Sequence, residues 1–537
     1  DMQFRFESEK TGKAPIDLQL SDMFGSAPKT VMEDRTVERI YEDVQYDKAK
    51  IGEYIENVLQ LESVACKDYL TNKVDRCVTG RVARQQTTGA LQLPLADLGA
   101  MALDYQGKEG IATSIGHAPV EALIDPRAGS RLSVAEALTN IVFAPLTHGL
   151  GGISLSANWM WPCRNEGEDA ALYAAVESLS DFAVALGVNV PTGKDSLSMT
   201  QKYKDGTRVL SPGTVIVSAA GEVSDVRGIL TPYLRRKGDH DIVYVDFSHS
   251  PRELGGSAFA QTLGRVGRRT PDVKDTEYFK KAFAAVQAVI GRGLAVSGHD
   301  ISAGGILTTL LEMCFAQVNL GAEIDLSSLG EEDSVKLLFA QNPGVLLQVR
   351  DTEAVRKIFE EYGVEIHVIG RAKAGKELKV KNGEETLSFH VPQLRDVWYK
   401  SSYLLDRRQS GAQKAKERYD NYKQQPLSYV FPEGFTGQAA DMGLDNARRK
   451  PTGIKAAIIR EQGSNSEREM AHALYLAGFD VKDVHMTDLI EGREDLSDVN
   501  LIAAVGGFSN SDVLGSAKGW AGSFKYNEKA RKALENF

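Results

Sequence analysis

The chain has 537 residues, too many for one hydrophobic core, so its length predicts three or four domains of about 150 residues each. Lys and Arg total 63 against 73 Asp and Glu, and the resulting charge of −10 argues against a surface that binds nucleic acid. Hydrophobic residues make up 42% of the chain, and no run reaches the roughly 18 apolar residues that span a bilayer, which excludes a membrane protein.

Residues 1–60 are the first predicted unit. They mix charge with short apolar runs, and helical spacing from Val37 to Leu61 predicts a connecting segment that ends in a helix. Residues 61–225 alternate β-rich runs, such as 213–220, with helical patterns, such as 168–187. This alternation indicates an α/β domain.

A second α/β unit, separate from the first, is predicted over residues 226–400. It opens with the strand-like run 241–247 and contains a helical pattern at 276–293 followed by a strand-like run at 294–298. Residues 401–452 are first charged and then rich in Gly and polar residues, which predicts a linker that wraps a surface.

Residues 453–537 begin a third unit. Their order of strand, Gly turn, helix and strand is typical of a flavodoxin-like sheet, and LIAAVGG supplies another buried strand. These 85 residues are too few to complete such a sheet. The chain also begins at Asp1 rather than Met and ends at Phe537 on a helix-like pattern, so we expect it to be an internal portion of a longer protein.

The four cysteines, Cys66, Cys77, Cys163 and Cys314, are far apart and form no CxxC pair. Their spacing argues against a disulfide framework and against a thiolate zinc site. The first residues contain no apolar signal-peptide core. Together these features predict a cytoplasmic protein.

Two oxygen-bearing side chains lie one turn apart in the predicted helix 130–140. Glu136 and Asn140 are four residues apart, so they face the same way and can share a hard cation. Asp97 and Asp300 each follow an apolar run at the point where a strand would end. Because Mg²⁺ prefers oxygen ligands and nucleotide phosphates, these acids are candidate ligands. The alternative for the Glu–Asn pair is a solvated helix face.

The segment GHDISAGG has the features of a phosphate-binding turn. Asp300 leaves a predicted strand, Ser302 can cap the next helix, and Gly304 and Gly305 permit close approach of a ligand. The alternative is an ordinary strand-to-helix turn. His299 is interpreted as a packing or turn residue rather than a ligand.

TGKDSLSMT places Lys194 and Asp195 in a predicted loop able to hold phosphate or metal, although it lacks the Walker spacing and a plain polar turn is the alternative. Trp159 and Trp161 are interpreted as core or domain-contact residues. The chain has no GxSxG or HExxH motif. The residues alone therefore indicate a multidomain α/β protein that binds a nucleotide and Mg²⁺.

Several motifs together closely resemble the large type of phosphoribosylformylglycinamidine synthase (formylglycinamide ribonucleotide amidotransferase). They are QLPLAD, GHAPVEALIDPRAGSRLSVAEALTN, SLSANWM, TGKDSLSM and GHDISAGG, followed by REQGSNSEREMAHALYLAGFD and GGFSNSDVLGSAKGWA. The resemblance implies aminoimidazole ribonucleotide synthetase-like domains of A type at 61–225 and B type at 226–400, as the second of two repeats. It also implies that 453–537 is the truncated start of a flavodoxin-like class I glutamine amidotransferase domain.

The resemblance implies a ligase of purine biosynthesis. In this family, ATP phosphorylates the amide oxygen of formylglycinamide ribonucleotide, and ammonia released from glutamine attacks the activated carbon to give formylglycinamidine ribonucleotide. The second repeat of large members holds an auxiliary nucleotide with magnesium. The implied partners are these substrates, together with the first synthase repeat or a second copy of this chain.

Carried over residue by residue, the resemblance implies a magnesium site with the ligands Asp97, Glu136, Asn140 and Asp300. The implied contacts to ATP or ADP are Ala96, Asp97, Ser302 and Lys194. The four metal ligands are the same oxygen donors that the chemistry of Mg²⁺ selected.

The chain also departs from the complete pattern of the family. The nucleophilic Cys, His and Glu of the glutaminase and the substrate-side His all lie outside it, so it contains no catalytic residue and alone is expected to be inactive. Asn510 and Ser511 stand where many relatives have Tyr and Gly, which affects the local oxyanion geometry. The alternatives are a non-catalytic, nucleotide-stabilised structural half and a kinase-like member of the same superfold. The GGFSNSD segment argues against the kinase-like protein, which has no amidotransferase domain.

Overall fold

The computed structural model describes residues 3–25, 31–105, 107–236, 238–424, 430–513 and 515–537. The predicted connecting segment 1–60 and linker 401–452 therefore fall partly outside the described residues. Within the described ranges, no helix combines the length and the apolar character that crossing a bilayer requires.

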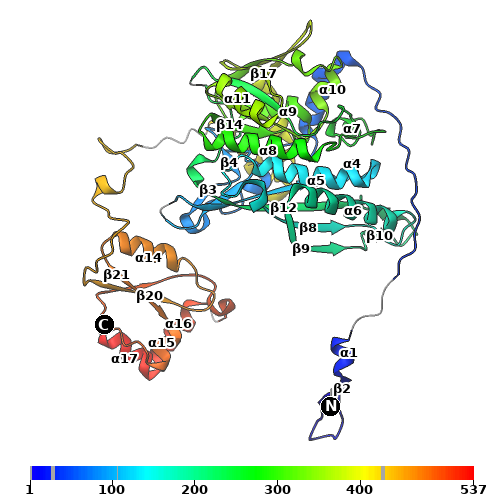
Figure 1. The fold of residues 1–537 in the computed structure, drawn as a ribbon. Coiled ribbons are helices and arrows are strands. Elements are labelled where there is room, and N and C mark those ends of the chain that lie inside the picture. Colours follow the sequence, from blue (N-terminus) through cyan, green and yellow to red (C-terminus); the bar gives the residue numbers. More distant parts are fainter. Residues whose placement is uncertain (1–2, 26–30, 106, 237, 425–429, 514) are drawn as a thin grey trace.

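The predicted helix from Val37 to Leu61 is wrong in its first half, because the only regular helix there, α2, spans Ile51–Gln60. Before it come β1 (Gln3–Phe6), β2 (Ile16–Gln19) and α1 (Leu20–Phe24). Residues 31–46 run along the body of the protein in extended form (Figure 1). Asp34 fixes this course, since its carboxylate accepts hydrogen bonds from the backbone N–H groups of Gly167 and Asp169 at a helix N-terminus.

The first α/β unit is built on a six-stranded sheet in the order β3-β6-β7-β12-β8-β9. The strands are β3 (Val82–Arg84), β6 (Gly99–Ala102), β7 (Gly110–His117), β12 (Thr214–Val223), β8 (Ser154–Met160) and β9 (Asn189–Ser196). Short strands β4 (Thr87–Thr88), β5 (Leu93–Pro94), β10 (Thr200–Lys202) and β11 (Arg208–Leu210) pair separately.

One face of this sheet is covered and the other is open. The helices are α3 (Asp68–Thr71), α4 (Pro119–Ile124), α5 (Pro126–Ile141) and α6 (Glu168–Leu186). The predicted helix 168–187 is confirmed, and Gly187 ends it with a left-handed φ of 76°. Along β7, buried and exposed residues alternate strictly, so the open face displays Ile111 and Ile115.

The second α/β unit has a seven-stranded sheet in the order β14-β16-β13-β17-β15-β18-β19. Its strands are β13 (Asp241–Asp246), β14 (Ala295–Asp300), β15 (Leu320–Asp325), β16 (Gly344–Val349), β17 (His367–Ala374), β18 (Glu377–Asn382) and β19 (Glu385–His390). Its helices are α7 (Ala258–Thr262), α8 (Thr276–Gly291), α9 (Gly305–Phe315), α10 (Ser334–Phe339) and α11 (Thr352–Tyr362). The predicted helix and strand at 276–298 are confirmed.

The two units are not separate, because they share one hydrophobic core. Helices α5 and α6 of the first face α8 of the second between the two sheets (Figure 1). The rings of Phe182 and Phe279 meet edge to face at a centroid distance of 5.8 Å. Both helical layers are apolar on their inner faces, and only mutual contact removes that surface from water.

Helices α12 (Val391–Ser410) and α13 (Ala412–Asn421) occupy the first part of the predicted linker. They pack back onto the body, since Trp398 is 1% exposed and donates its indole N–H to the carbonyl of Val64 at 3.0 Å. The charged residues of this stretch therefore belong to a pair of amphipathic helices that cover α2 and α9, rather than to a linker.

Residues 453–537 form the predicted strand, turn, helix and strand. Parallel strands β20 (Lys455–Arg460), β21 (Asp480–His485) and β22 (Leu501–Ala504) form a sheet in the order β21-β20-β22. The helices are α14 (Glu467–Leu476), α15 (Met486–Glu491), α16 (Ala517–Tyr526) and α17 (Glu528–Asn536). A stacked pair of rings, Tyr105 and His472, 4.1 Å apart, connects this unit to the first.

Candidate metal and nucleotide site

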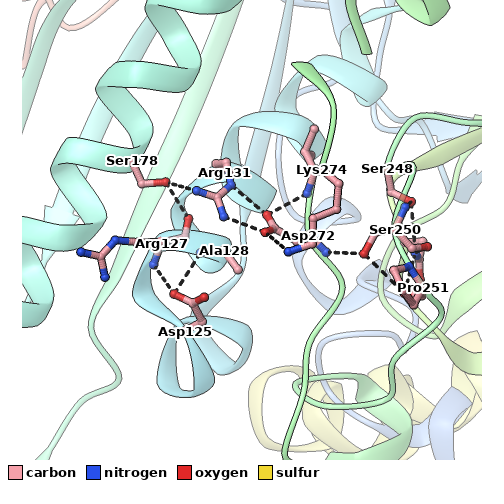
Figure 2. Close-up of polar contacts among 12 residues, drawn as sticks. Asp125, Arg127, Ala128, Arg131, Ser178, Ser248, Ser250, Pro251, Asp272 and Lys274 are labelled. Carbon is pink, nitrogen blue, oxygen red and sulfur yellow. Dashed lines mark hydrogen bonds and ion pairs between the residues drawn. The ribbon is translucent and has the colours of Figure 1, made fainter. Parts of the chain in front are cut away.

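Helix α5 carries two of the predicted ligands, and contacts at its N-terminus and one turn further along hold it in place. Asp125 caps its N-terminus by accepting a hydrogen bond from the Arg127 backbone N–H at 2.8 Å. One turn on, Arg131 makes a bidentate ion pair with Asp272 of the second unit, at 2.8 and 2.7 Å (Figure 2). Lys274 donates to the same carboxylate at 2.9 Å. The helix therefore holds a set position relative to both sheets.

Glu136 and Asn140 lie over the end of β7, so the solvated-face alternative is wrong. Glu136 accepts a hydrogen bond from the His117 backbone N–H at 3.0 Å, and the amide nitrogen of Asn140 donates to the carbonyl of Ile115 at 3.2 Å. That bond leaves the Asn140 side-chain oxygen as the atom able to bind a cation. Burial raises the pKa of Glu136 to about 8, and the negative charge of Asp300 adds to the rise.

Asp97, His299 and Asp300 form a buried cluster whose ligand atoms all lie within 4.8 Å of one another. Asp300 ends strand β14, as predicted. Asp97 lies in the loop between β5 and β6, not directly at a strand end. The side chains of Asp97 and Asp300 are only 6% and 2% exposed. Two carboxylates buried this closely require a positive charge.

His299 is the residue that sequence reasoning underestimated. Its Nδ1 lies 3.1 Å from Asp97 Oδ1 and 3.2 Å from Asp300 Oδ1, while its Nε2 lies 3.4 Å from Glu312 Oε2. Burial alone would lower the pKa of His299, but the carboxylates around it outweigh burial and raise that pKa well above its usual value. The only available signal was its position between Gly298 and Asp300 in GHD.

A further atom shows that the cluster suits a cation. Asp300 Oδ2 is buried and has no hydrogen-bond partner among the described residues. A buried carboxylate oxygen left in this state is costly unless a cation binds it. The carboxylates of Asp97 and Asp300 match the preference of Mg²⁺ for oxygen, whereas the predicted ligand Glu136 is not part of this group of ligand atoms.

A cavity of about 220 Å³ includes Glu136, Ile301 and Ser302 in its lining, whereas Asp97, His299 and Asp300 are not part of that lining. Ser302 does not cap α9, because the N-cap residue is Gly304, with φ 96°. The backbone carbonyl of Ser302 instead accepts a hydrogen bond from the Gly305 backbone N–H at 3.0 Å. The Ala96 backbone N–H donates to the carbonyl of Gln86 at 3.2 Å, and Ala96 is not in the lining of this cavity.

Lys194 lies apart from this cavity. The TGKDS residues form edge strand β9 rather than a loop, and Lys194 pairs with Asn158. The same row continues through Ile216 to His117, so three strand spacings of about 4.8 Å place Lys194 roughly 14 Å from His117. Its ammonium group hydrogen-bonds Ser196 at 2.5 Å. Trp161 is 2% exposed in the core, as interpreted.

In the last unit, the GGFSNSD turn is shaped by its two unusual residues. Asn510 and Ser511 both adopt left-handed φ values, 52° and 56°. The Asn510 backbone N–H donates to Gln462 at 2.9 Å, and Ser509 accepts the indole N–H of Trp520 at 2.8 Å. These hydrogen bonds fold the turn back onto the QGSN loop. They hold left-handed backbone angles at two positions that are not glycine.

Three family models match the chain. Residues 66–222 match the FGAR-AT PurM_N-like domain, residues 242–382 the C-terminal domain of AIR synthase related proteins, and residues 453–537 the CobB/CobQ-like glutamine amidotransferase domain. The predicted fold class is thus confirmed.

Curated relatives match nearly the whole chain. It is 38% identical over 97% of its length to the probable phosphoribosylformylglycinamidine synthase, chloroplastic/mitochondrial, of Arabidopsis thaliana and 39% identical over 97% to the human phosphoribosylformylglycinamidine synthase. The chain spans 37% and 39% of these two proteins. Among solved structures, T. maritima PurL complexed with FGAR has the same fold, with a TM-score of 0.50 and 15% identity over 65% of this chain and 55% of that one.

Proposed function

Because this chain is homologous over nearly its whole length to phosphoribosylformylglycinamidine synthases, we propose that it carries part of their reaction in purine biosynthesis. That reaction uses ATP and glutamine to convert formylglycinamide ribonucleotide to formylglycinamidine ribonucleotide. The amidotransferase match at residues 453–537 favours this reaction over kinase-like chemistry. The observation that carries the proposal is the convergence of carboxylates from two domains at one buried position.

The role proposed for residues 61–400 is to hold a magnesium-bound ATP or ADP. Asp97, Glu136, Asn140 and Asp300 would bind the metal, while Ala96 and Ser302 would face the nucleotide. The bound Mg²⁺ would supply the positive charge that neutralises both the carboxylates and the phosphates. Since the ligands come from both α/β units, the nucleotide would join the two units, which favours an auxiliary, structural role for it.

Calorimetric titration of residues 1–537 with ADP and Mg²⁺ tests the proposal. We expect one magnesium-dependent site and no formylglycinamidine ribonucleotide when ATP, the ribonucleotide substrate and ammonium are supplied. Glutamine hydrolysis is also expected to be absent, because residues 453–537 contain no cysteine. Measurable turnover would contradict the auxiliary role, and absence of magnesium-dependent binding would contradict the site.

The open face of the first sheet is proposed to receive another synthetase-like repeat or a second copy of this chain. Met101, Ile111 and Ile115 are 41%, 45% and 55% exposed on this face. Introducing a charge by Ile115→Lys is expected to shift the chain from dimer to monomer in sedimentation velocity at micromolar concentration. Val184→Lys, at a 77% exposed site on α6, is the control. A wild-type chain that stays monomeric would eliminate the second copy as partner.

A cytoplasmic location is also proposed. All four cysteines are free thiols, and three of them are buried. This state suits a reducing compartment.

A further inference from the structure

A basic pocket of about 560 Å³ lies at the far end of strand β14 from the cluster of Asp97, His299 and Asp300. Arg235, Arg236 and Arg350 line it together with His240. Val296, near the start of β14, is in the lining, while Asp300 ends the same strand, so about 13 Å of extended chain separates pocket and cluster. The pocket is therefore a different place in the fold from the proposed nucleotide site.

The positive charge of the pocket is not neutralised. No carboxylate in the described ranges makes an ion pair with any of its three arginines, whereas the chain as a whole carries a charge of −10. The acids near these arginines along the chain have other partners: Asp239 and Asp241 are both held by Arg371, and Asp351, next to Arg350, caps α11 by accepting a hydrogen bond from the Ala354 backbone N–H. Three like charges on one cavity repel each other, so an anion bound there gains their combined attraction.

The Arg235 guanidinium is held in place before any ligand arrives. Its carbon lies 4.5 Å from the centroid of the Tyr233 ring, and one nitrogen donates to the Thr231 hydroxyl at 3.1 Å. The Arg235 backbone exchanges two hydrogen bonds with the side chain of Gln348, at 2.7 and 2.9 Å. Gln348 is only 1% exposed. Gln348 therefore fixes the backbone position of Arg235, while Tyr233 and Thr231 orient its guanidinium.

Two further features indicate an organic ligand rather than a bare ion. Leu234, Val318 and Leu320 give the pocket an apolar wall, and its volume is within the roughly 300–1,000 Å³ typical of small-molecule sites. His240 Nδ1 is buried without a hydrogen-bond partner among the described residues, so a polar ligand atom is left to satisfy it. We propose that this pocket binds a phosphate-bearing organic molecule of about nucleotide size, with the arginines on its phosphate.

Titration of the full chain with AMP in EDTA tests this site apart from the magnesium site, which needs its metal. We expect saturable binding of AMP, tighter than that of inorganic phosphate because of the apolar wall. The double variant Arg235→Gln/Arg350→Gln should bind at least about tenfold more weakly, as expected for lost charge-assisted hydrogen bonds. Arg268→Gln, an exposed arginine outside the pocket, is the matched control and should bind as the wild type does.

Three results would overturn the inference. They are no AMP binding, equal affinity for AMP and inorganic phosphate, and unchanged affinity in the double variant. Both arginines are exposed, so the double variant is expected to fold, and its thermal unfolding curve verifies this. Retention of AMP binding in an Asp300→Asn variant would show that the pocket acts independently of the proposed magnesium site.

Discussion

Replacing Asp300 with asparagine is expected to weaken binding of Mg–ADP by at least about 100-fold. The substitution keeps the shape of a side chain in a residue that is 1% exposed but removes the negative charge proposed to bind the cation. Even outer partners of metal ligands cost about 10- to 100-fold in metal affinity, so loss of a direct ligand should exceed that range. Calorimetry with ADP and Mg²⁺ measures the effect.

Asp181→Asn provides the control, because this acid is exposed on α6 and far from the cluster. It should bind Mg–ADP with wild-type affinity. Asp300→Asn must retain the wild-type far-ultraviolet dichroism for its loss of binding to be read as a site effect. Unchanged affinity in a folded Asp300→Asn protein would remove Asp300 from the ligand set.

The variant Glu136→Gln separates the effect on Mg–ADP binding from the effect on folding stability more clearly than Asp300→Asn does. Burial raises the pKa of Glu136 to about 8, so at pH 7 the ligand-free protein holds this side chain mainly neutral. Glutamine is also neutral and of the same shape, so the ligand-free variant should unfold at a temperature equal to or above that of the wild type. The stabilisation that Mg–ADP gives, about 2.7 kcal/mol at 100 times the dissociation constant, should be lost.

Sequence reasoning could place the proposed ligands on their secondary-structure elements because that placement depends on local patterns. Glu136 and Asn140 follow helical spacing, and Asp300 follows an apolar run that does form a strand. That Asp300 lies near enough to Glu136 for its charge to help raise the pKa of Glu136 is a property of the tertiary fold. It depends on α5 packing beside β14, which the Arg131–Asp272 pair fixes from a point 141 residues away.

The errors have physical causes of the same kind. Helical apolar spacing was predicted from Val37 onward, but the extended path of residues 31–46 is fixed at Asp34 by the N–H groups at the start of α6, which no local pattern reveals. The TGKDS run is polar enough for a loop, yet pairing with β8 makes it an edge strand. The contact of His299 with Asp97, two hundred residues earlier and 3.1 Å from its Nδ1, likewise depends on the tertiary fold.

The two α/β units were predicted as separate because each has its own alternation of strands and helices. The structure shows that their helices form one core, so the boundary near residue 226 divides sheets rather than hydrophobic cores. Helical apolar spacing cannot distinguish a helix that packs on its own sheet from one that also packs on a neighbouring domain.

Replacing Asp68 with alanine is expected to destabilise the body of the protein by about 3 kcal/mol. Asp68 is 3% exposed and accepts hydrogen bonds from Arg418 at 2.5 and 2.6 Å and from the Tyr399 hydroxyl at 2.5 Å. Breaking a buried ion pair costs about 3–5 kcal/mol, and the low end applies because the Arg418 side chain is 32% exposed. Urea unfolding of variant and wild type measures the difference in free energy of unfolding.

The loss should be greatest around α13, because Arg418 lies on that helix and Asp68 holds it against the body. Hydrogen exchange of amides 412–421 should therefore accelerate more than that of β13. Lys416→Ala breaks only an exposed ion pair with Asp420 on the same helix and should cost no more than about 0.5 kcal/mol.

Burial would raise the pKa of Asp68, but Arg418 and Tyr399 outweigh burial and lower it. The stabilisation is therefore complete above about pH 3.9, the usual pKa of an unfolded aspartate, and is lost as pH falls through the lower pKa of the folded protein. If the difference in stability between wild type and Asp68→Ala stayed constant through that acid range, the ion pair would not be its source.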